Sequence, residues 1–119
     1  MAIKLFDSEL KVMDILWKAG DVSAKRLAEM LLEQVGWSKT TTYTVIKKCL
    51  DKGAIARSEP GFICKALISR EAAQTYETDE LVGKLFDGSP DLLVASLLSR
   101  KTLTPPEIAK LRALVDHLK

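Results

Sequence analysis

Three stretches of helical periodicity, each closed by a glycine, fill the first part of the chain. Leucine, methionine and tryptophan side chains recur every three or four positions from residue 10 to residue 17, and similar spacing returns twice further on. Each stretch begins at a short oxygen-bearing side chain, which can accept from the free amides of a first helical turn. The expected caps are Asp7 or Ser8, then Ser23, then Ser38, and the expected ends are Gly20, Gly36 and Gly53.

The pattern changes after the third helix. Residues 54–58 and 62–68 are short and lack helical periodicity, and Glu59-Pro60-Gly61 lies between them. Proline fixes φ at one turn position and glycine accepts a positive φ at the next, so this sequence predicts a tight turn. Two strands joined by such a turn form a β-hairpin. Three helices followed by a hairpin are the order of elements in a winged helix-turn-helix.

Helical periodicity resumes after Leu67 and continues to the end of the chain. Ser69 is the expected cap of a helix that Gly88 stops, and Ser89-Pro90 is the expected start of another. Thr104-Pro105-Pro106-Glu107 has the pattern of a capping box for the last helix. That helix carries one apolar stripe: Ile108, Leu111, Leu114, Val115 and Leu118.

The third predicted helix has two contrasting faces. At 100° per residue, five side chains suited to a core fall together: Thr42, Val45, Ile46, Cys49 and Leu50. The other face shows hydroxyl, phenol and ammonium groups, which can neutralise phosphates and reach base edges in the major groove of double-stranded DNA. A merely solvated helix face is the alternative. The candidate DNA-binding residues of this helix are Ser38, Lys39, Thr40, Thr41, Tyr43, Thr44, Lys47 and Lys48. The three threonines and Tyr43 are expected near bases and the three lysines on phosphates, and Ser38 marks a helix amino end that can face a phosphate.

Two basic residues of the predicted hairpin extend this set. Arg57 lies in the first strand and Lys65 in the second, where they can place the hairpin on the DNA backbone. The alternative is ordinary charge at a strand edge, which discourages aggregation.

Charge is distributed unevenly along the chain. The 119 residues include 18 Lys and Arg against 16 Asp and Glu, a net charge of only +2. Residues 36–58 hold five basic residues and one acidic residue, a local charge of +4, whereas residues 69–119 hold seven basic and eight acidic residues. The positive charge therefore concentrates in the predicted third helix and first strand of the hairpin. One such domain makes few phosphate contacts and binds weakly, so we expect the working unit to be a dimer.

Several other classes of protein are disfavoured. The apolar runs fall far below the roughly 18 residues that a membrane span needs, and the start has no signal-peptide core, so we expect a cytoplasmic protein without membrane insertion. Cys49, Cys64 and His117 are too few for a structural zinc site, and we expect no metal and no cofactor. No phosphate-binding glycine loop, carboxylate pair or nucleophile elbow indicates an enzyme.

The second half of the chain is expected to dimerise. The segment 92–98 is apolar on nearly every face, and a helix of that kind must be buried on all sides. About 50 residues cannot supply that burial alone, but two copies can. The alternative is that these helices fold back onto the first domain. The candidate dimerisation residues are Tyr76, Leu85, Phe86, Leu92, Leu93, Leu97, Leu111 and Leu114.

Together these features predict a mainly α-helical protein of two domains. Residues 1–68 are the predicted winged helix-turn-helix DNA-binding domain, with three helices and a β-hairpin wing. Residues 69–119 are the predicted C-terminal helical dimerisation domain.

The sequence resembles the penicillinase repressors of the BlaI/MecI type over nearly its whole length. The resemblance depends on an ordered set of short runs: LKVMDILW at 10–17, VS at 22–23, TTYTVI at 41–46, DKGAI at 51–55 and EIAKL at 107–111. It implies a dimeric winged-helix repressor that binds a palindromic operator and controls β-lactam resistance genes.

The resemblance also suggests how repression would end. In the antibiotic-responsive branch of the family, a membrane sensor protease triggers cleavage within the dimerisation segment. The matching bond here joins Ser96 and Leu97, where other members have Asn-Phe. The copper-responsive branch has a cysteine-rich tail, which this chain lacks. Two alternatives remain at this point: a winged-helix protein–protein adaptor, and a dimeric regulator that responds to a different signal.

Overall fold

The computed structural model describes residues 3–99 and 103–116. The chain forms two compact units, Met1–Glu77 and Thr78–Lys119. Helix α4, Arg70–Leu85, therefore begins in the first unit and ends in the second. The sequence placed a boundary at residue 68, where helical periodicity resumes, but the first two turns of α4 belong to the compact first unit.

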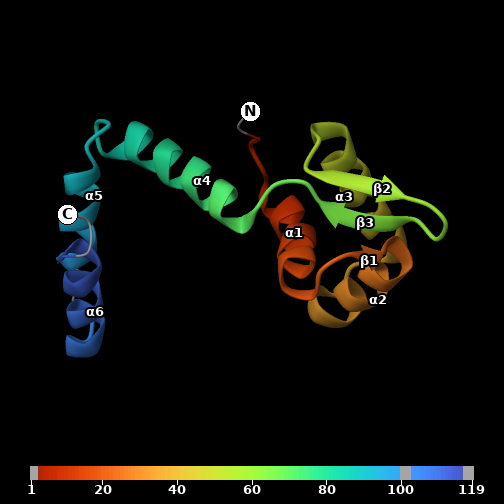
Figure 1. The fold of residues 1–119 in the computed structure, drawn as a ribbon, viewed down its shortest axis with the longest axis horizontal. Helices are drawn as coiled ribbons and strands as arrows, with labels where there is room; N and C mark the ends of the chain where they lie inside the picture. Colours follow the sequence, from red (N-terminus) through yellow and green to blue (C-terminus); the bar gives the residue numbers. More distant parts are fainter. Residues whose placement is uncertain (1–2, 100–102, 117–119) are drawn as a thin grey trace. The chain divides into compact units, whose positions relative to one another are not determined.

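The first unit has the predicted order of three helices and a hairpin (Figure 1). The prediction of a mainly helical winged helix-turn-helix is confirmed. Its elements are α1 Asp7–Ala19, β1 Val22–Ser23, α2 Ala24–Val35, α3 Lys39–Lys52, β2 Ile55–Ser58 and β3 Ile63–Ala66.

The second and third helices begin and end where the sequence predicts. The Ser23 hydroxyl accepts from the Arg26 amide at 3.0 Å, and the Ser38 hydroxyl accepts from the Thr41 amide at 3.2 Å. Gly53 closes α3 at φ +81°, a left-handed conformation that glycine adopts without steric cost.

The predicted start of α1 was wrong by one or two residues. The helix begins after Phe6 rather than at an Asp7 or Ser8 cap. Phe6 offers no side-chain oxygen, and its own amide donates to the Glu9 carboxylate at 2.8 Å. Glu9 therefore satisfies a backbone group at the start of the helix from three residues downstream.

The sheet has one strand more than the sequence predicts. Strands β2 and β3 form the expected antiparallel hairpin, and β1 pairs with the other edge of β3, with Val22 opposite Cys64. A strand of two residues is too short to show the alternation of apolar and polar side chains by which strands are recognised.

The core of the first unit lies among its three helices and the sheet. Met13, Leu27, Leu31 and Ile46 are fully buried there. Cys49 and Cys64 are fully buried free thiols. Burial raises the pKa of Cys49 to about 12 and that of Cys64 to about 11, because a thiolate is poorly solvated in apolar surroundings.

One buried hydroxyl lies in this core without a hydrogen-bond partner among the described residues. The Thr42 side chain is 0% exposed and its Oγ1 makes no hydrogen bond there. We expect Thr42→Val to raise the free energy of unfolding by about 1 kcal/mol, because it removes an unsatisfied polar group at nearly constant shape. Urea unfolding of the full chain measures this gain. Thr41→Val is the matched control, since the exposed Thr41 hydroxyl already accepts from Ser38; an equal gain in both variants would contradict the explanation.

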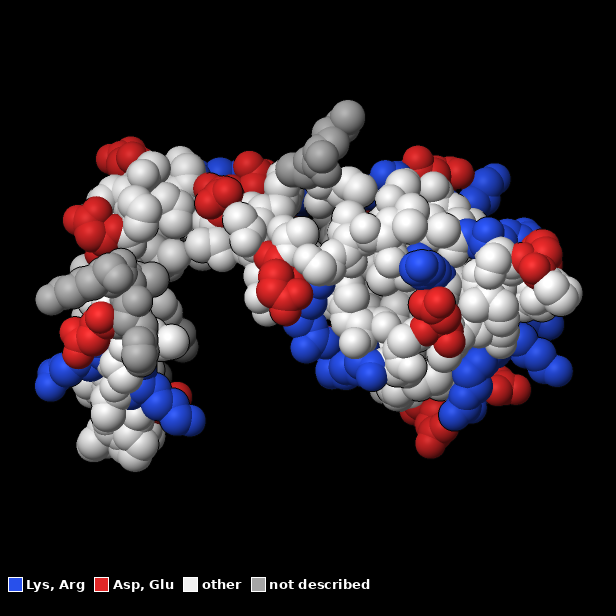
Figure 2. All heavy atoms as spheres, viewed as in Figure 1, with Lys and Arg blue, Asp and Glu red and all other residues white. Residues whose placement is uncertain are grey.

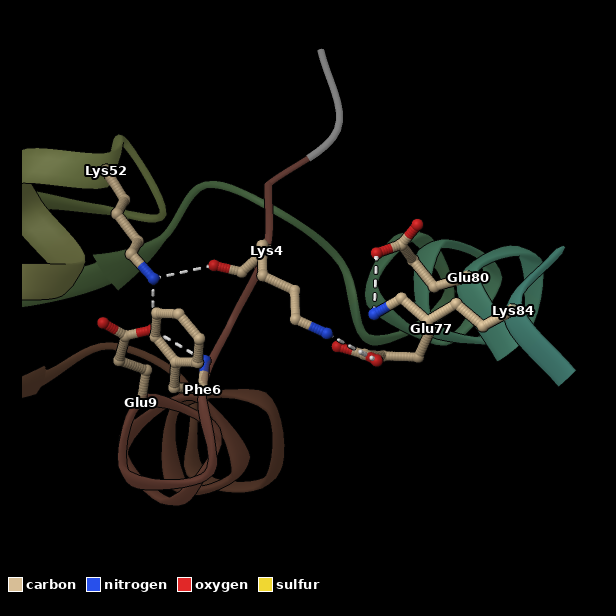
Figure 3. A network of polar contacts seen from close by, with 7 residues as sticks. All are labelled: Lys4, Phe6, Glu9, Lys52, Glu77, Glu80 and Lys84. Carbon is tan, nitrogen blue, oxygen red and sulfur yellow. Dashed lines mark hydrogen bonds and ion pairs between the residues drawn. The ribbon is translucent and has the colours of Figure 1, made fainter. Parts of the chain in front are cut away.

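The first turns of α4 and the residues just before them are held against α1 and against the segment that precedes α1. The Trp17 indole donates to the carbonyl of Ile68 at 2.9 Å, and Arg70 pairs with Asp14 at 3.2 Å. Figure 3 shows Lys4 directed at Glu77 on α4, at 3.4 Å. These contacts explain why the first unit extends beyond the hairpin.

The second unit contains the end of α4 followed by α5, Pro90–Leu98, and α6, Pro105–Asp116. The predicted capping box of α6 is confirmed, since the Thr104 amide donates to Glu107 at 2.9 Å and the Glu107 amide to Thr104 Oγ1 at 3.3 Å. At the start of α5 the Ser89 hydroxyl bonds to Asp91 instead of a backbone amide, which differs from the expected cap. His117 and Leu118, named in the sequence predictions, lie outside the described residues.

The helices of the second unit bury little surface. No side chain of α5 or of the described part of α6 is buried. Leu85 is 73% exposed and Leu114 is 63% exposed.

Candidate nucleic-acid interface

Helix α3 buries the face predicted for the core. Thr42, Val45, Ile46 and Cys49 are buried, and Leu50 is half-buried. Because side chains three and four positions apart share a helix face, this burial turns the opposite face to solvent.

Five of the predicted DNA-binding side chains line one shallow depression on α3. The depression has a volume of about 590 Å³ and is formed by Lys39, Thr40, Tyr43, Thr44 and Lys47. Tyr43 is half-buried and the other four are exposed. Hydroxyl and ammonium groups are therefore gathered on one open surface.

The hydroxyls of this helix are oriented by their own hydrogen bonds. Thr44 Oγ1 donates to the carbonyl of Thr40 at 2.9 Å, and Ser38 Oγ donates to Thr41 Oγ1 at 3.0 Å. The hydroxyl proton of Thr44 is therefore engaged within the helix, while its oxygen lone pairs remain able to accept. Such oxygens suit the amino groups of adenine and cytosine, and a threonine methyl suits the methyl of thymine.

The remaining predicted residues of α3 lie outside the depression. Ser38 and Thr41 are exposed at the amino end of the helix, and Lys48 is exposed further along it. The amino end of a helix carries free amides and a partial positive charge, both of which favour a phosphate.

The two predicted residues of the wing differ in their surroundings. Lys65 is exposed on β3. Arg57, on β2, forms an ion pair with Glu59 in the turn. Hydrogen bonds lower the pKa of Glu59 below its usual value of 4.5. The bond from the Arg57 side chain has the largest effect on this pKa, and the bond from the Phe62 amide has the next largest. Arg57 is therefore partly neutralised and held in place by the turn.

Three residues of this region were not among the predicted site residues, although the sequence placed Glu59 in the predicted turn. Phe62 and Glu59 shape the turn of the wing around Arg57. Lys52 contributes to the local charge of +4, but its ammonium group lies 2.6 Å from the buried carboxylate of Glu9. Of these three residues, only Phe62 carried a signal in the sequence, because it is an aromatic residue directly after the turn glycine Gly61.

Charged side chains of both signs share the surface of the first unit. Figure 2 shows Lys and Arg interspersed with Asp and Glu on the face in view. The excess of positive charge in residues 36–58 is a property of the sequence, where five basic residues stand against one acidic residue.

Neither a metal-binding cluster nor a membrane-spanning helix is present in the part of the chain that the structure describes. No group of three His, Cys, Asp or Glu side chains there is placed to hold a metal ion. No helix within residues 3–99 and 103–116 is both long enough and apolar enough to cross a membrane.

The predicted dimerisation residues fall into both units. Tyr76 is half-buried in the first unit, where the Lys4 ammonium group lies 6.0 Å from its ring centre. The others belong to the second unit. Leu85, Leu92 and Leu114 are exposed, whereas Phe86, Leu93, Leu97 and Leu111 are half-buried.

A family model described as "Penicillinase repressor" matches residues 5–117 of the chain. The chain belongs to the penicillinase repressor family. The resemblance read from the short sequence runs is thereby confirmed, and the family name denotes a repressor rather than an enzyme.

Curated relatives in this family match the chain over nearly its full length. The penicillinase repressor of Bacillus licheniformis is 22% identical over 98% of this chain and 92% of its own length. The methicillin resistance regulatory protein MecI of Mammaliicoccus sciuri is 25% identical over 95% of this chain and 94% of its own. The MecI protein of Staphylococcus aureus is 24% identical over the same shares.

Solved structures of the repressor BlaI have a similar fold over part of this chain. The DNA-binding domain of the repressor BlaI is similar with a TM-score of 0.56, at 24% identity over 60% of this chain and 90% of that chain. The Bacillus licheniformis BlaI monomeric form in complex with the blaP half-operator is similar with a TM-score of 0.54, at the same identity and coverage.

Proposed function

We propose that this member of the penicillinase repressor family is a transcriptional repressor that binds a palindromic operator as a homodimer in the cytoplasm. The observation that carries the proposal is the depression on α3, where Lys39, Lys47 and three hydroxyl-bearing side chains meet. The relatives named penicillinase repressor and methicillin resistance regulatory protein favour β-lactam resistance genes as its targets.

The contacts expected with DNA divide by chemistry. Lysine ammonium groups neutralise phosphates whatever the sequence, so Lys39, Lys47 and Lys48 are expected to supply affinity. Threonine oxygens and methyls can distinguish base edges in the major groove, so Thr40 and Thr44 are expected to supply sequence preference.

The proposed dimer depends on the second unit. A groove of about 410 Å³ lies between α5 and α6, and its walls are apolar side chains that include Val94, Leu98, Leu114 and Val115. All four are at least 43% exposed. A contiguous exposed apolar surface of this kind marks an interaction site.

We propose that a second copy of this chain covers the groove. The helices that form it bury no side chain of their own among the described residues, and a unit of this size buries too little surface by itself. Pairing two identical units would bury the exposed leucines of both. It would also relate the two winged domains by a two-fold axis, and a palindromic DNA site has the same symmetry.

Release from DNA by a membrane sensor protease is part of the proposal. Ser96 is exposed and Leu97 is half-buried, and both lie within α5. A protease takes its substrate as an extended strand, so cleavage of this bond would require α5 to unwind locally. A helix with few buried contacts unwinds at low cost.

Salt-dependent binding tests the proposal. We expect binding of the protein to a duplex from its own promoter region to weaken steeply as salt rises, because phosphate contacts release counterions. Lys47→Ala is expected to weaken binding to all duplexes about equally and to reduce the slope of log K against log salt by about 1. Fluorescence anisotropy at several salt concentrations measures both effects.

The matched control is Lys18→Ala on α1. Lys18 is an exposed lysine paired with Asp14 at 2.9 Å, away from the depression, and its removal should leave the slope unchanged. A protein–protein adaptor would show no steep salt slope with any duplex, and that result would overturn the proposal.

A further inference from the structure

Four side chains form a continuous stack between α3 and the wing. The rings of Tyr43 and Phe62 meet edge to face, with centroids 6.0 Å apart and planes at 75°. The Arg57 guanidinium carbon lies 3.7 Å from the centre of the Phe62 ring. The Lys39 ammonium group lies 5.8 Å from the centre of the Tyr43 ring. The two aromatic rings thus pack against each other between two cations, Lys39 at the depression and Arg57 in the wing, in favourable geometries.

The position of the Phe62 ring is fixed by its backbone. Phe62 has φ +50°, a left-handed conformation that residues with side chains rarely adopt. Its amide donates to the Glu59 carboxylate at 3.2 Å, and its carbonyl accepts from the Ala24 amide at the start of α2 at 2.9 Å. Backbone contacts on both sides therefore hold the ring against Tyr43.

The stack leaves Arg57 able to bind an anion. Its Nε donates to Glu59, and its side chain remains 50% exposed. A guanidinium group has five N–H donors, so its terminal nitrogens are still available for a phosphate.

We propose that Tyr43 is a positioning residue that couples the recognition helix to the wing through Phe62. Its ring holds the turn of the wing at a fixed angle to α3, so that Arg57 and the lysines of the depression reach the same duplex together. The inference rests on the proposed DNA-binding function. In this role the Tyr43 ring sets the geometry of the site, independently of any contact that the Tyr43 hydroxyl makes.

A double-mutant cycle on the full-length protein tests the coupling. Tyr43→Leu and Phe62→Leu are each expected to weaken duplex binding by about 2- to 10-fold, the range expected for loss of one edge-to-face pair. The double variant should bind no more weakly than either single variant, since the same contact is lost in all three. Each variant should also lose about one unit of salt slope, because Arg57 no longer reaches its phosphate. Fully additive losses in the double variant would overturn the inference.

Amide exchange in the free protein separates this inference from the proposed function. Tyr43→Leu should speed exchange of the Phe62 amide, which donates to Glu59. Tyr43→Phe, which keeps the ring, should retain the protection of the unaltered protein. If the protein bound no duplex but Tyr43→Leu still loosened the wing, only the proposed function would fail. An unchanged Phe62 exchange rate in Tyr43→Leu would overturn the coupling whether or not the protein binds DNA.

Discussion

Leu114→Asp is expected to convert the protein into a monomer and to weaken its binding to a whole palindromic operator by about 100-fold or more. Leu114 is 63% exposed and lines the apolar groove of the second unit. A charge at this position would be left without water or a partner if a second copy covered the groove. The same charge costs the separate chain little, because the side chain already faces solvent.

The size of this effect follows from linked binding. Two winged domains joined in a dimer bind their half-sites as one event, and the second domain gains an effective concentration that a free monomer lacks. Affinity for a single half-site should therefore stay nearly unchanged in Leu114→Asp, because the variant leaves the α3 surface intact.

Sedimentation and duplex titration measure the two parts of this prediction. Leu67→Asp is the matched control, since Leu67 is 56% exposed in the first unit and lies outside the groove. It should remain dimeric. A Leu114→Asp protein that stays dimeric and keeps full operator affinity would show that the groove is not the interface. An unaltered protein that is already a monomer would favour helices folded back onto the winged domain.

The second large effect is expected at a buried ion pair. Lys52→Met should lower the free energy of unfolding by about 3–5 kcal/mol, because it leaves the carboxylate of Glu9 buried and unpaired. Glu9 is 1% exposed, and the Lys52 ammonium group lies 2.6 Å from its Oε1 (Figure 3). Lys52 also donates to the Lys4 carbonyl at 2.8 Å and lies 4.2 Å from the centre of the Phe6 ring.

This pair connects the end of α3 to the start of α1. Its loss should therefore loosen the recognition helix as well as reduce stability. Urea unfolding measures the change, and Glu9→Gln combined with Lys52→Met should recover part of it, since the double variant buries no unpaired charge.

An exposed ion pair provides the comparison. Lys18→Met removes a partner of Asp14, but that pair is 67% and 47% exposed. Exposed pairs contribute little, so the change should stay within about 0.5 kcal/mol. Equal losses in Lys18→Met and Lys52→Met would contradict the assigned role of the buried pair.

The recognition helix could be predicted from the sequence because its determinants are local. Ser38, Gly53 and the buried set between them lie within one stretch of chain, and helical spacing alone separates that set from the exposed face. The same is true of the capping box at Thr104 and Glu107.

The features that escaped prediction depend on contacts between distant segments. Glu9 and Lys52 are 43 positions apart, so the sequence showed Lys52 only as one more basic residue. Strand β1 exists because Val22 and Ser23 pair with β3, far along the chain. The contact of Tyr43 with Phe62 needs the folded hairpin, and no spacing in the sequence encodes it.

Footprinting of the DNA upstream of the protein's own gene and its neighbours tests the central claim most directly. We predict a protected region with two-fold symmetry, whose half-sites are separated by about one helical turn, roughly 10 base pairs, or a multiple of it. Protection of both half-sites should appear at the same protein concentration and should be lost in Leu114→Asp at that concentration. Protection without symmetry, or none at any concentration, would contradict a dimeric repressor of a palindromic operator.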